Sequence, residues 1–480
     1  MILLSIITAP ILASAISLLV RKEAKMLNAI ALLASMFELS VVALIVSSVV
    51  KGGSSSWGPY FFVDSLGALL LILIAIVGCA VSFYGVSYIK TEVSKGIIGF
   101  HRVKQFFVLL HLFLFAMFFA IITTSPVLMW ISIEATTLST AFLISFYNKP
   151  SAIEAAWKYL IINSIGLLLA FLGTLMVFTL LPADHQGWIS WASLLGQAGN
   201  LNPAVARMAF IFILIGYGTK MGLAPMHTWL PDAHSKAPVP ISSLLSGVLL
   251  NVAFLGILRF KAIIDVSIGF DFSRGLLIFL GVFSTVIAAF IILAQKNYKR
   301  LLAYSSIEHM GVMAVGFGFG GLAAQAALLH LVYHALAKSS LFLSVGNIFL
   351  KYGSTKMANV RGVISKLPVT GPLFIIGFLA ITGIPPFGIF FTEFSILAAG
   401  IGRHPAAVII MLLSLVLVFV GFLRHAVAMM FGESEKDLSR GEFGAWTTVP
   451  IIILLIILAV LSVMIPAPLE SLLKSATLLY

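Results

Sequence analysis

The sequence predicts an all-α polytopic membrane protein, on the evidence of its composition and its long apolar segments. Of the 480 residues, 61% are hydrophobic and only 10% are charged. Soluble domains are about 45–50% apolar and about 25% charged, so a water-soluble fold could not bury this much apolar surface. A cytoplasmic globular enzyme, a secreted disulfide scaffold and a disordered protein are excluded.

Cysteine content and charge restrict the cofactors and partners. Cys79 is the only cysteine, and an iron–sulfur cluster needs about four thiolates. The formal charge is +12, but the basic residues lie in short loops between apolar segments, which favours a membrane surface over nucleic acid. We therefore expect lipid surroundings, no nucleic-acid partner, and no cofactor or metal held by this chain.

About fourteen segments are apolar enough to cross a bilayer, whose core of about 30 Å needs about 20 helical residues. In the first segment the positive charges follow the apolar stretch, so we interpret it as a retained span rather than a signal peptide. The twelfth is too long and too rich in proline to be one straight helix. The expected spans are 2–20, 27–50, 62–89, 105–124, 126–147, 156–181, 206–225, 238–260, 275–294, 302–319, 322–350, 369–400, 405–430 and 447–467.

These spans are expected to form one membrane-embedded domain. Its parts are three N-terminal helices (1–104), two five-helix units (105–260 and 275–430) and a C-terminal helix (447–480). The odd-numbered loops carry most of the lysine and arginine, for example at Arg21, Lys22, Lys90, Lys95 and Lys299. By the positive-inside rule, both termini face outward from the cell (plasma) membrane.

An internal repeat relates the two five-helix units, spans 4–8 and 9–13. At one offset of roughly 170 positions, Glu134 matches Glu308, Lys220 matches Glu393, and Asn251 matches Arg424. Because five is an odd number, the second copy must be inverted, which is typical of transporters with interrupted helices.

Proline marks the expected interruptions. Pro225 follows Lys220, and the pair Pro385 and Pro386 precedes Glu393. Proline frees backbone carbonyls, and these are tolerated at membrane depth only inside protein or beside water. We expect broken helices, and hydrated places near both charges.

Ionisable residues within the spans are the strongest functional signal. They are Glu134, Lys158, Lys220, Glu308, His330, His334, Lys338 and Glu393. One charge at mid-bilayer costs about 2.5–3.5 kcal/mol even on the lenient insertion scale. These groups must therefore face the interior, pair with one another and contact water.

Glu134 and Lys220 form the first expected pair, within a few ångströms of each other. Such a pair titrates as a coupled unit, as a proton relay requires; the alternative is a static ion pair that fixes helix register. We expect Lys158 to tune one of the two.

In the second unit, His330, His334 and Lys338 follow each other at i, i+4 and i+8, so they share one helix face. They predict a ladder of titratable groups that ends outward at Glu393; the alternative is packing histidines. The spacing of His330 and His334 would permit a shared metal ion, but this indication is weak because no third ligand is evident. Glu308 and His309 are either relay groups or merely interfacial.

Segment 217–238 (YGTKMGLAPMHTWLPDAHSKAP) resembles the seventh-helix motif of the antiporter-like subunits of respiratory complex I. Those subunits are related to the large subunits of multisubunit cation/proton antiporters. Segments 133–137 (IEATT), 156–159 (AWKY) and 304–311 (YSSIEHMG) are most similar to hydrogenase-4 component F of membrane-bound group 4 [NiFe] hydrogenases and formate hydrogenlyase.

The resemblance implies roles for matching positions. Glu134 matches the fifth-helix glutamate, Lys220 the seventh-helix lysine, Lys338 the central lysine and Glu393 the twelfth-helix charge. Relatives often carry lysine or histidine where this chain has Asn251, so His227, His234 or ordered water would have to bridge that gap. No long lateral helix follows the last span, so the distal, arm-bearing subunit type is not expected.

The sequence thus predicts a proton-translocating subunit without a redox centre of its own. The implied partners are other membrane subunits and peripheral [NiFe] hydrogenase and iron–sulfur subunits, whose electron transfer would drive ion movement. Two alternatives stay open: a subunit of a standalone Na⁺/H⁺ antiporter, and a structural subunit with an idle channel. Whether the ion is H⁺ or Na⁺ also stays open.

Overall fold

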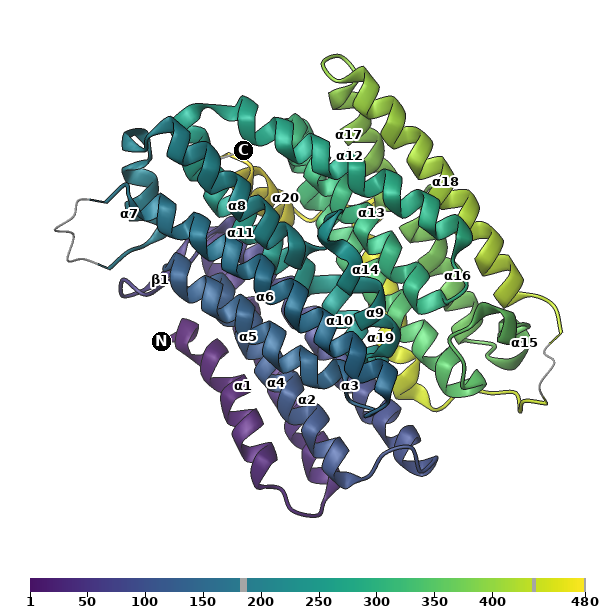
Figure 1. Cartoon of the computed structure of the whole chain (residues 1–480). Coiled ribbons are helices and arrows are strands. Elements are labelled where there is room, and N and C mark those ends of the chain that lie inside the picture. Colours follow the sequence, from purple (N-terminus) through teal and green to yellow (C-terminus); the bar gives the residue numbers. More distant parts are fainter. Residues whose placement is uncertain (182–187, 434–436, 479–480) are drawn as a thin grey trace.

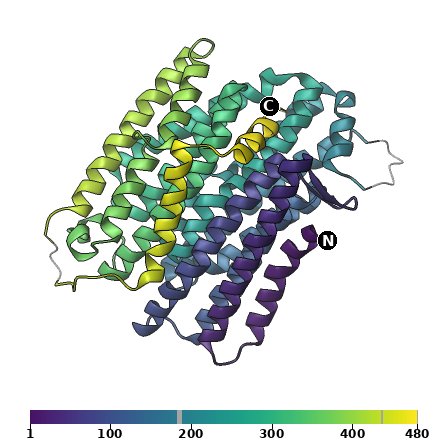
Figure 2. The ribbon, with the colours of Figure 1, turned by 180° about the vertical axis from the view of Figure 1, so that it is seen from behind.

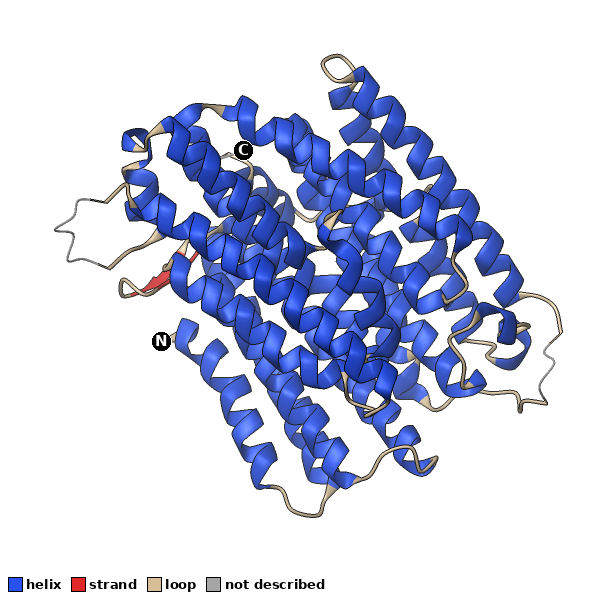
Figure 3. Cartoon of the chain, viewed as in Figure 1, coloured by secondary structure: helices blue, strands red, loops and turns tan. Residues whose placement is uncertain are grey.

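The computed structural model describes residues 1–181, 188–433 and 437–478, and in them the chain is a bundle of long helices (Figures 1 and 3). Residues 182–187 of the long loop, and the last two residues of the expected C-terminal part, lie outside the described residues. A short antiparallel hairpin, β1 (Ser55–Trp57) and β2 (Phe61–Val63), joins the second and third helices.

The first part of the chain, up to residue 268, contains helices α1 to α11. The helices are α1 (Ile2–Leu19), α2 (Ala24–Gly52), α3 (Ser65–Ser94), α4 (Phe100–Ile122), α5 (Pro126–Ile144), α6 (Pro150–Phe178), α7 (Trp191–Gly196), α8 (Pro203–Met221), α9 (Trp229–Lys236), α10 (Val239–Leu244) and α11 (Leu250–Ile268). A π-helical segment, Leu245–Leu249, joins α10 to α11. The short helix α7 lies in the loop that the sequence left without structure.

The second part, from residue 270 onward, contains helices α12 to α20. They are α12 (Phe270–Ala294), α13 (Tyr298–Phe319), α14 (Leu322–Tyr352), α15 (Val363–Lys366), α16 (Thr370–Ile381), α17 (Gly388–Gly400), α18 (Pro405–Met430), α19 (Val449–Val463) and α20 (Ala467–Ala476). Figure 2 shows α19 and α20 on the reverse face of the bundle.

Within the described residues, eleven helical spans are long and apolar enough to cross a membrane, or twelve if the bent pair α19–α20 counts as one span. The sequence expected about fourteen. The remaining expected spans correspond to the more polar α13, to the short helices α16 and α17, and to α19, which bends by 76° into α20. The breaks leave α16, α17 and α19 too short to count as single spans, and polar and charged residues lower the hydropathy of α13.

Two helices are interrupted beside the prolines. Helix α8 ends at Met221, Gly222 has a φ of 87°, and the Ala224 amide donates to Ser284 Oγ of α12 at 2.9 Å. Helix α16 ends at Ile381, and Gly383 has a φ of 65°. This positive φ favours glycine, and a Cβ at Gly383 would lie 2.5 Å from Glu393 Oε2, so a larger residue would also displace this carboxylate.

Helix α14 lies in the centre of the second unit. It packs against α13, α16, α17 and α19, and also contacts α3 and α10. In its most apolar window, 94% of the residues are buried. Polar side chains on α14 therefore face protein rather than lipid.

An ion pair joins the hairpin end of α3 to α11. Asp64 caps α3 by accepting from the Gly67 amide at 2.8 Å, and it pairs with Arg259. Burial acts to raise the pKa of Asp64, but the Arg259 guanidinium and the Gly67 amide outweigh it and hold that pKa below its usual value.

Candidate functional site

Lys220 is fully buried in the last turn of α8, directly before the break. Its Nζ donates to Thr137 Oγ1 at 2.8 Å and to the Tyr159 hydroxyl at 2.7 Å. The Tyr159 hydroxyl also lies 2.6 Å from Thr140 Oγ1. Two hydroxyl groups, on α5 and α6, thus hold the amine.

Glu134 lies on α5, one turn before Thr137. Its Oε1 accepts from Ser164 Oγ at 2.7 Å, while Oε2 is buried without a hydrogen-bond partner among the described atoms. It interacts electrostatically with Lys220, but the two form no direct ion pair in the part of the chain that the structure describes. Thr137 and Tyr159, rather than Glu134, make the hydrogen bonds to the Lys220 amine.

In the second half, the ladder residues His330, His334 and Lys338 are all fully buried on α14. Lys338 Nζ donates to the Leu302 carbonyl of α13 at 2.9 Å. The His334 ring lies 5.2 Å from the His309 ring, and neither of its nitrogens has a hydrogen-bond partner among the described atoms.

Glu308 and His309 are buried inside the protein. Both are 1% exposed in the middle of α13, and His309 Nε2 lies 3.4 Å from Glu308 Oε2. They bring a carboxylate and an imidazole against the ladder of α14.

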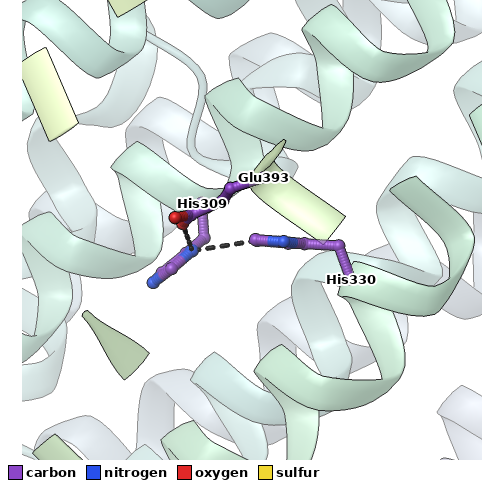
Figure 4. Close-up of side chains that lie close together, drawn as sticks. All are labelled: His309, His330 and Glu393. Atoms are coloured by element: carbon purple, nitrogen blue, oxygen red, sulfur yellow. Dashed lines mark hydrogen bonds and ion pairs between the residues drawn. The ribbon is translucent and has the colours of Figure 1, made fainter. Parts of the chain in front are cut away.

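His309 also connects the ladder to α17 (Figure 4). Its Nδ1 is 2.9 Å from His330 Nε2 and 4.0 Å from Glu393 Oε1. His330 Nδ1 in turn lies 2.9 Å from Thr392 Oγ1. Helices α13, α14 and α17 therefore contribute to one hydrogen-bonded cluster.

These three residues could also offer ligands to one metal ion. One atom each of His309, His330 and Glu393 lies within 4.8 Å of the others. Two nitrogens on a tetrahedral zinc lie roughly 3.3 Å apart, given zinc–nitrogen bonds of about 2.0–2.1 Å. The 2.9 Å separation of the two histidine nitrogens is that of a hydrogen bond rather than of two ligands on one zinc ion.

Two histidines lie between the halves. His227, in the segment after the break, has its ring 6.0 Å from the ring of Tyr304 on α13. His234, on α9, stacks on Phe342 of α14 at 4.8 Å, and both of its nitrogens lack a partner among the described atoms.

Asn251 cannot replace a titrating group. Its Nδ2 donates to Gly247 O at 2.9 Å, within its own helix, and its Oδ1 has no partner among the described atoms. The histidines are therefore better placed than Asn251 to connect the halves.

Two expected residues lie away from the cluster. Lys158 is not buried: its side chain is 49% exposed, and it pairs with Glu154 at 2.6 Å and with Asp232 at 3.5 Å rather than with Glu134. Arg424 is exposed on α18. Each lies on a helix that turns only one face to the bundle, so position within a span does not ensure burial.

Sequence reasoning missed four groups. Thr137 and Tyr159 carry the hydroxyls on Lys220. Glu92 and Lys299 are buried although they lie beyond the expected span ends. The signal for Glu92 was its position only three residues past residue 89, well within the uncertainty of a span boundary.

Known proteins resemble this chain in sequence. Residues 123–419 match the family described as "NADH:quinone oxidoreductase/Mrp antiporter, TM". The hydrogenase-4 component F homolog of Methylacidiphilum infernorum (isolate V4) is 37% identical over 386 residues, which cover 80% of this chain and 81% of that protein.

Solved structures share the fold. A chain of the archaeal membrane-bound sulfane sulfur reductase aligns with a TM-score of 0.86 at 22% identity, covering 99% of this chain and 96% of the other. A chain of the Mrp complex from Dietzia sp. DQ12-45-1b aligns with a TM-score of 0.84 at 18% identity, with the same coverage. At these identities the likeness is one of fold.

Proposed function

Because the chain belongs to the NADH:quinone oxidoreductase/Mrp antiporter membrane-subunit family, we propose that it is a proton-translocating, antiporter-like membrane subunit of a redox-driven complex. Electron transfer occurs in partner subunits, and this chain holds no redox cofactor. Its task is to move protons through the buried row of glutamate, lysine and histidine side chains.

The observation that carries the proposal is the concentration of ionisable groups in the second half. Glu308, His309, His330, His334, Lys338 and Glu393 are all buried and lie on three adjoining helices. A packed structural core gains little from so many buried charges, because desolvation offsets their mutual attraction. A proton path needs them.

Opposite charges modulate the lysines. At an effective dielectric of about 20, unit charges 4 Å apart interact by about 4 kcal/mol, and the interaction falls with distance. A change in the charge or position of Glu134 therefore alters the proton affinity of Lys220. Glu308 interacts with Lys338 in the same way in the second half.

Nitrogen donors favour H⁺ as the ion. Hard metal cations prefer oxygen ligands, whereas Lys220, Lys338 and the histidines present nitrogen, which binds protons. A standalone Na⁺/H⁺ antiporter subunit is the second candidate, favoured only by the fold it shares with the Mrp chain. The hydrogenase-4 relative, at higher identity, favours a redox complex with peripheral [NiFe] hydrogenase and iron–sulfur partners.

The finer topology belongs to the same proposal. We infer fourteen spans, which adds α13, the broken α16–α17 pair and α19 to the eleven apolar spans. The units are inverted repeats, supported by breaks at corresponding places near residues 222 and 383. Both termini face outward from the plasma membrane, as the charge in the odd-numbered loops indicates.

The test is proton uptake into vesicles that contain the purified, assembled complex. Lys220→Ala and Lys338→Ala should each abolish coupled pumping while electron transfer stays at least partly intact. Lys220→Arg should also fail, because arginine does not release its proton. Glu134→Gln should impair pumping by removing the modulating charge.

Lys158→Ala is the matched control, because this lysine is half exposed and pairs at the surface. It should pump normally. Wild-type pumping by both Lys220→Ala and Lys338→Ala would contradict the proposed path. Proton uptake driven by a Na⁺ gradient without electron transfer would favour the antiporter candidate.

A further inference from the structure

We propose that Glu92 and Lys299 form the cytoplasmic loading site of the proton row, where protons enter on their way to His234 and Lys338. This inference rests on the proposed function and names the entrance to the same path. Neither residue was singled out by the sequence, and both are buried near helix ends on the face of the basic loops.

Glu92 is a buried carboxylate close to the surface. It is 0% exposed, yet α3 ends two residues later at Ser94, and the loop residues 95–97 are exposed. Its Oε1 accepts from the Tyr147 hydroxyl at 2.5 Å, and Tyr147 is 3.1 Å from the Tyr88 hydroxyl. Its Oε2 has no partner among the described atoms and is free to take a proton.

Lys299 is the basic counterpart of Glu92. It lies in the first turn of α13, 3% exposed, and its Nζ donates to the Ala237 carbonyl at 2.6 Å. The positive end of a helix dipole is unfavourable for an ammonium group. Glu92, which interacts electrostatically with Lys299, supplies the opposing charge.

Lys299 also connects to the row already described. Ala237 directly follows α9, the helix that carries His234, and His234 interacts electrostatically with both Lys299 and Lys338. Lys338 Nζ binds the Leu302 carbonyl, one turn after Lys299 on α13. Glu92, Lys299, His234 and Lys338 thus succeed one another inward from the loop face.

The chemistry is proton transfer alone. A proton from cytoplasmic water binds Glu92 Oε2, and the O–H bond then breaks as an N–H bond forms on the neutral Lys299 amine, directly or through water. The carboxylate is restored, and the ammonium passes its proton toward His234. Besides each other, the titratable groups near this pair in the described residues include Tyr84, Tyr88, Tyr147, Lys95, Lys236 and His234.

Glu38 provides the matched contrast. It is 2% exposed on α2 and also has a carboxylate oxygen without a partner among the described atoms. Unlike Glu92, it has no lysine or histidine acting on it electrostatically among the residues that the structure describes. Both carboxylates are thus buried, but in the described residues it is Glu92 that has a basic neighbour.

The experiment measures protons pumped per electron transferred by the assembled complex in vesicles, across a range of pH. Glu92→Gln and Lys299→Met should each lower this ratio by at least about tenfold. This is a modest expectation, because a positioned proton-transfer group typically contributes about 10²–10⁴-fold to a rate. Glu92→Asp should recover much of the ratio with a shifted pH profile, which a purely structural role would not produce. Glu38→Gln should leave the ratio unchanged.

Wild-type pumping by Glu92→Gln and Lys299→Met, with Lys220→Ala inactive, would overturn the loading site and leave the proposed function standing. Wild-type pumping by Lys220→Ala as well would remove the proposed function itself. If Glu92→Gln fails to assemble, Lys299→Met and Glu92→Asp decide the question. An equal loss of proton pumping per electron in Glu38→Gln would mean that the losses come from general destabilisation, and it would overturn the proposal.

Discussion

Hydroxyl groups, rather than a carboxylate, contact Lys220, and this suits a residue that changes its protonation state. A hydroxyl both donates and accepts hydrogen bonds. Thr137 and Tyr159 can therefore accept from the ammonium and donate to the neutral amine without leaving their places. A carboxylate at the same distance would favour the charged form alone.

Tyr159→Phe removes one of these hydroxyls and should slow coupled pumping several-fold, because the Lys220 amine loses a hydrogen-bond partner worth about 1.5–3 kcal/mol when charged. Proton uptake per turnover in vesicles measures the effect. Tyr217→Phe is the control, since that buried hydroxyl has no hydrogen-bond partner among the described atoms. Equal pumping by the two variants would argue against a role for the Tyr159 hydroxyl.

For single residues, sequence spacing predicted where some side chains lie but not where others lie. The i, i+4, i+8 pattern placed His330, His334 and Lys338 on one face because helix geometry alone fixes that relation. Lys158 lay equally within an expected span, yet its exposure depends on which face of α6 meets the bundle. Glu92 was missed because hydropathy falls before the helix ends.

Helices α12 and α13 cross at a pair of glycines. A Cβ on Gly281 would lie 2.6 Å from the Gly311 carbonyl oxygen, and a Cβ on Gly311 would lie 2.6 Å from the Gly281 oxygen. Small residues permit such close approach of helices in membranes, where dispersion contacts drive packing. The crossing positions α13, and with it Glu308 and His309.

Gly281→Leu should therefore destabilise the protein by about 1–3 kcal/mol or more through overpacking. Thermal unfolding of the purified protein in detergent measures this as a lower midpoint temperature. Gly275→Leu, on the same helix, meets no atom within 4 Å and should unfold like the wild type. An unchanged midpoint for Gly281→Leu would show that the crossing is looser than described.

Whether a helix or strand could be predicted from the sequence depended on what stabilises it. Long apolar helices could be predicted because twenty apolar residues have few alternatives to spanning a bilayer. The hairpin, α7 and α20 could not, since short elements depend on contacts with the bundle rather than on their own pattern. Pro225 indicated where a helix would be interrupted, but not that Gly222 turns the chain there.

Across the whole molecule, the two halves of the chain carry different chemistry, at positions that the proposed repeat would relate. The first half holds Lys220 among hydroxyls, and the second holds Lys338 near histidines and carboxylates. In the proposed topology, Glu92 and Lys299 lie toward the cytoplasm and Glu393 toward the outside. The function of the row depends on this orientation.

Cysteine labelling can test the orientation, because Cys79 is the only cysteine. In a Cys79→Ser background, a membrane-impermeant thiol reagent added outside the cell should label Ser54→Cys, in the exposed loop before the hairpin. It should not reach Lys22→Cys, in the loop between α1 and α2. The reverse pattern would place both termini in the cytoplasm.

The hydrogen-bonded cluster in Figure 4 has a further kinetic consequence. His309 Nδ1 and His330 Nε2 face each other at 2.9 Å, so only one of them carries the shared hydrogen, and its position fixes the tautomers of both neutral rings. In the proposed path, a proton that moves along His309 and His330 toward Thr392 turns each ring nitrogen that had donated a hydrogen bond into an acceptor. The hydrogen-bond chain then donates in the opposite direction and cannot carry a second proton until its rings and hydroxyl rotate back. This rotation, rather than the proton transfer itself, would limit the rate at which successive protons pass.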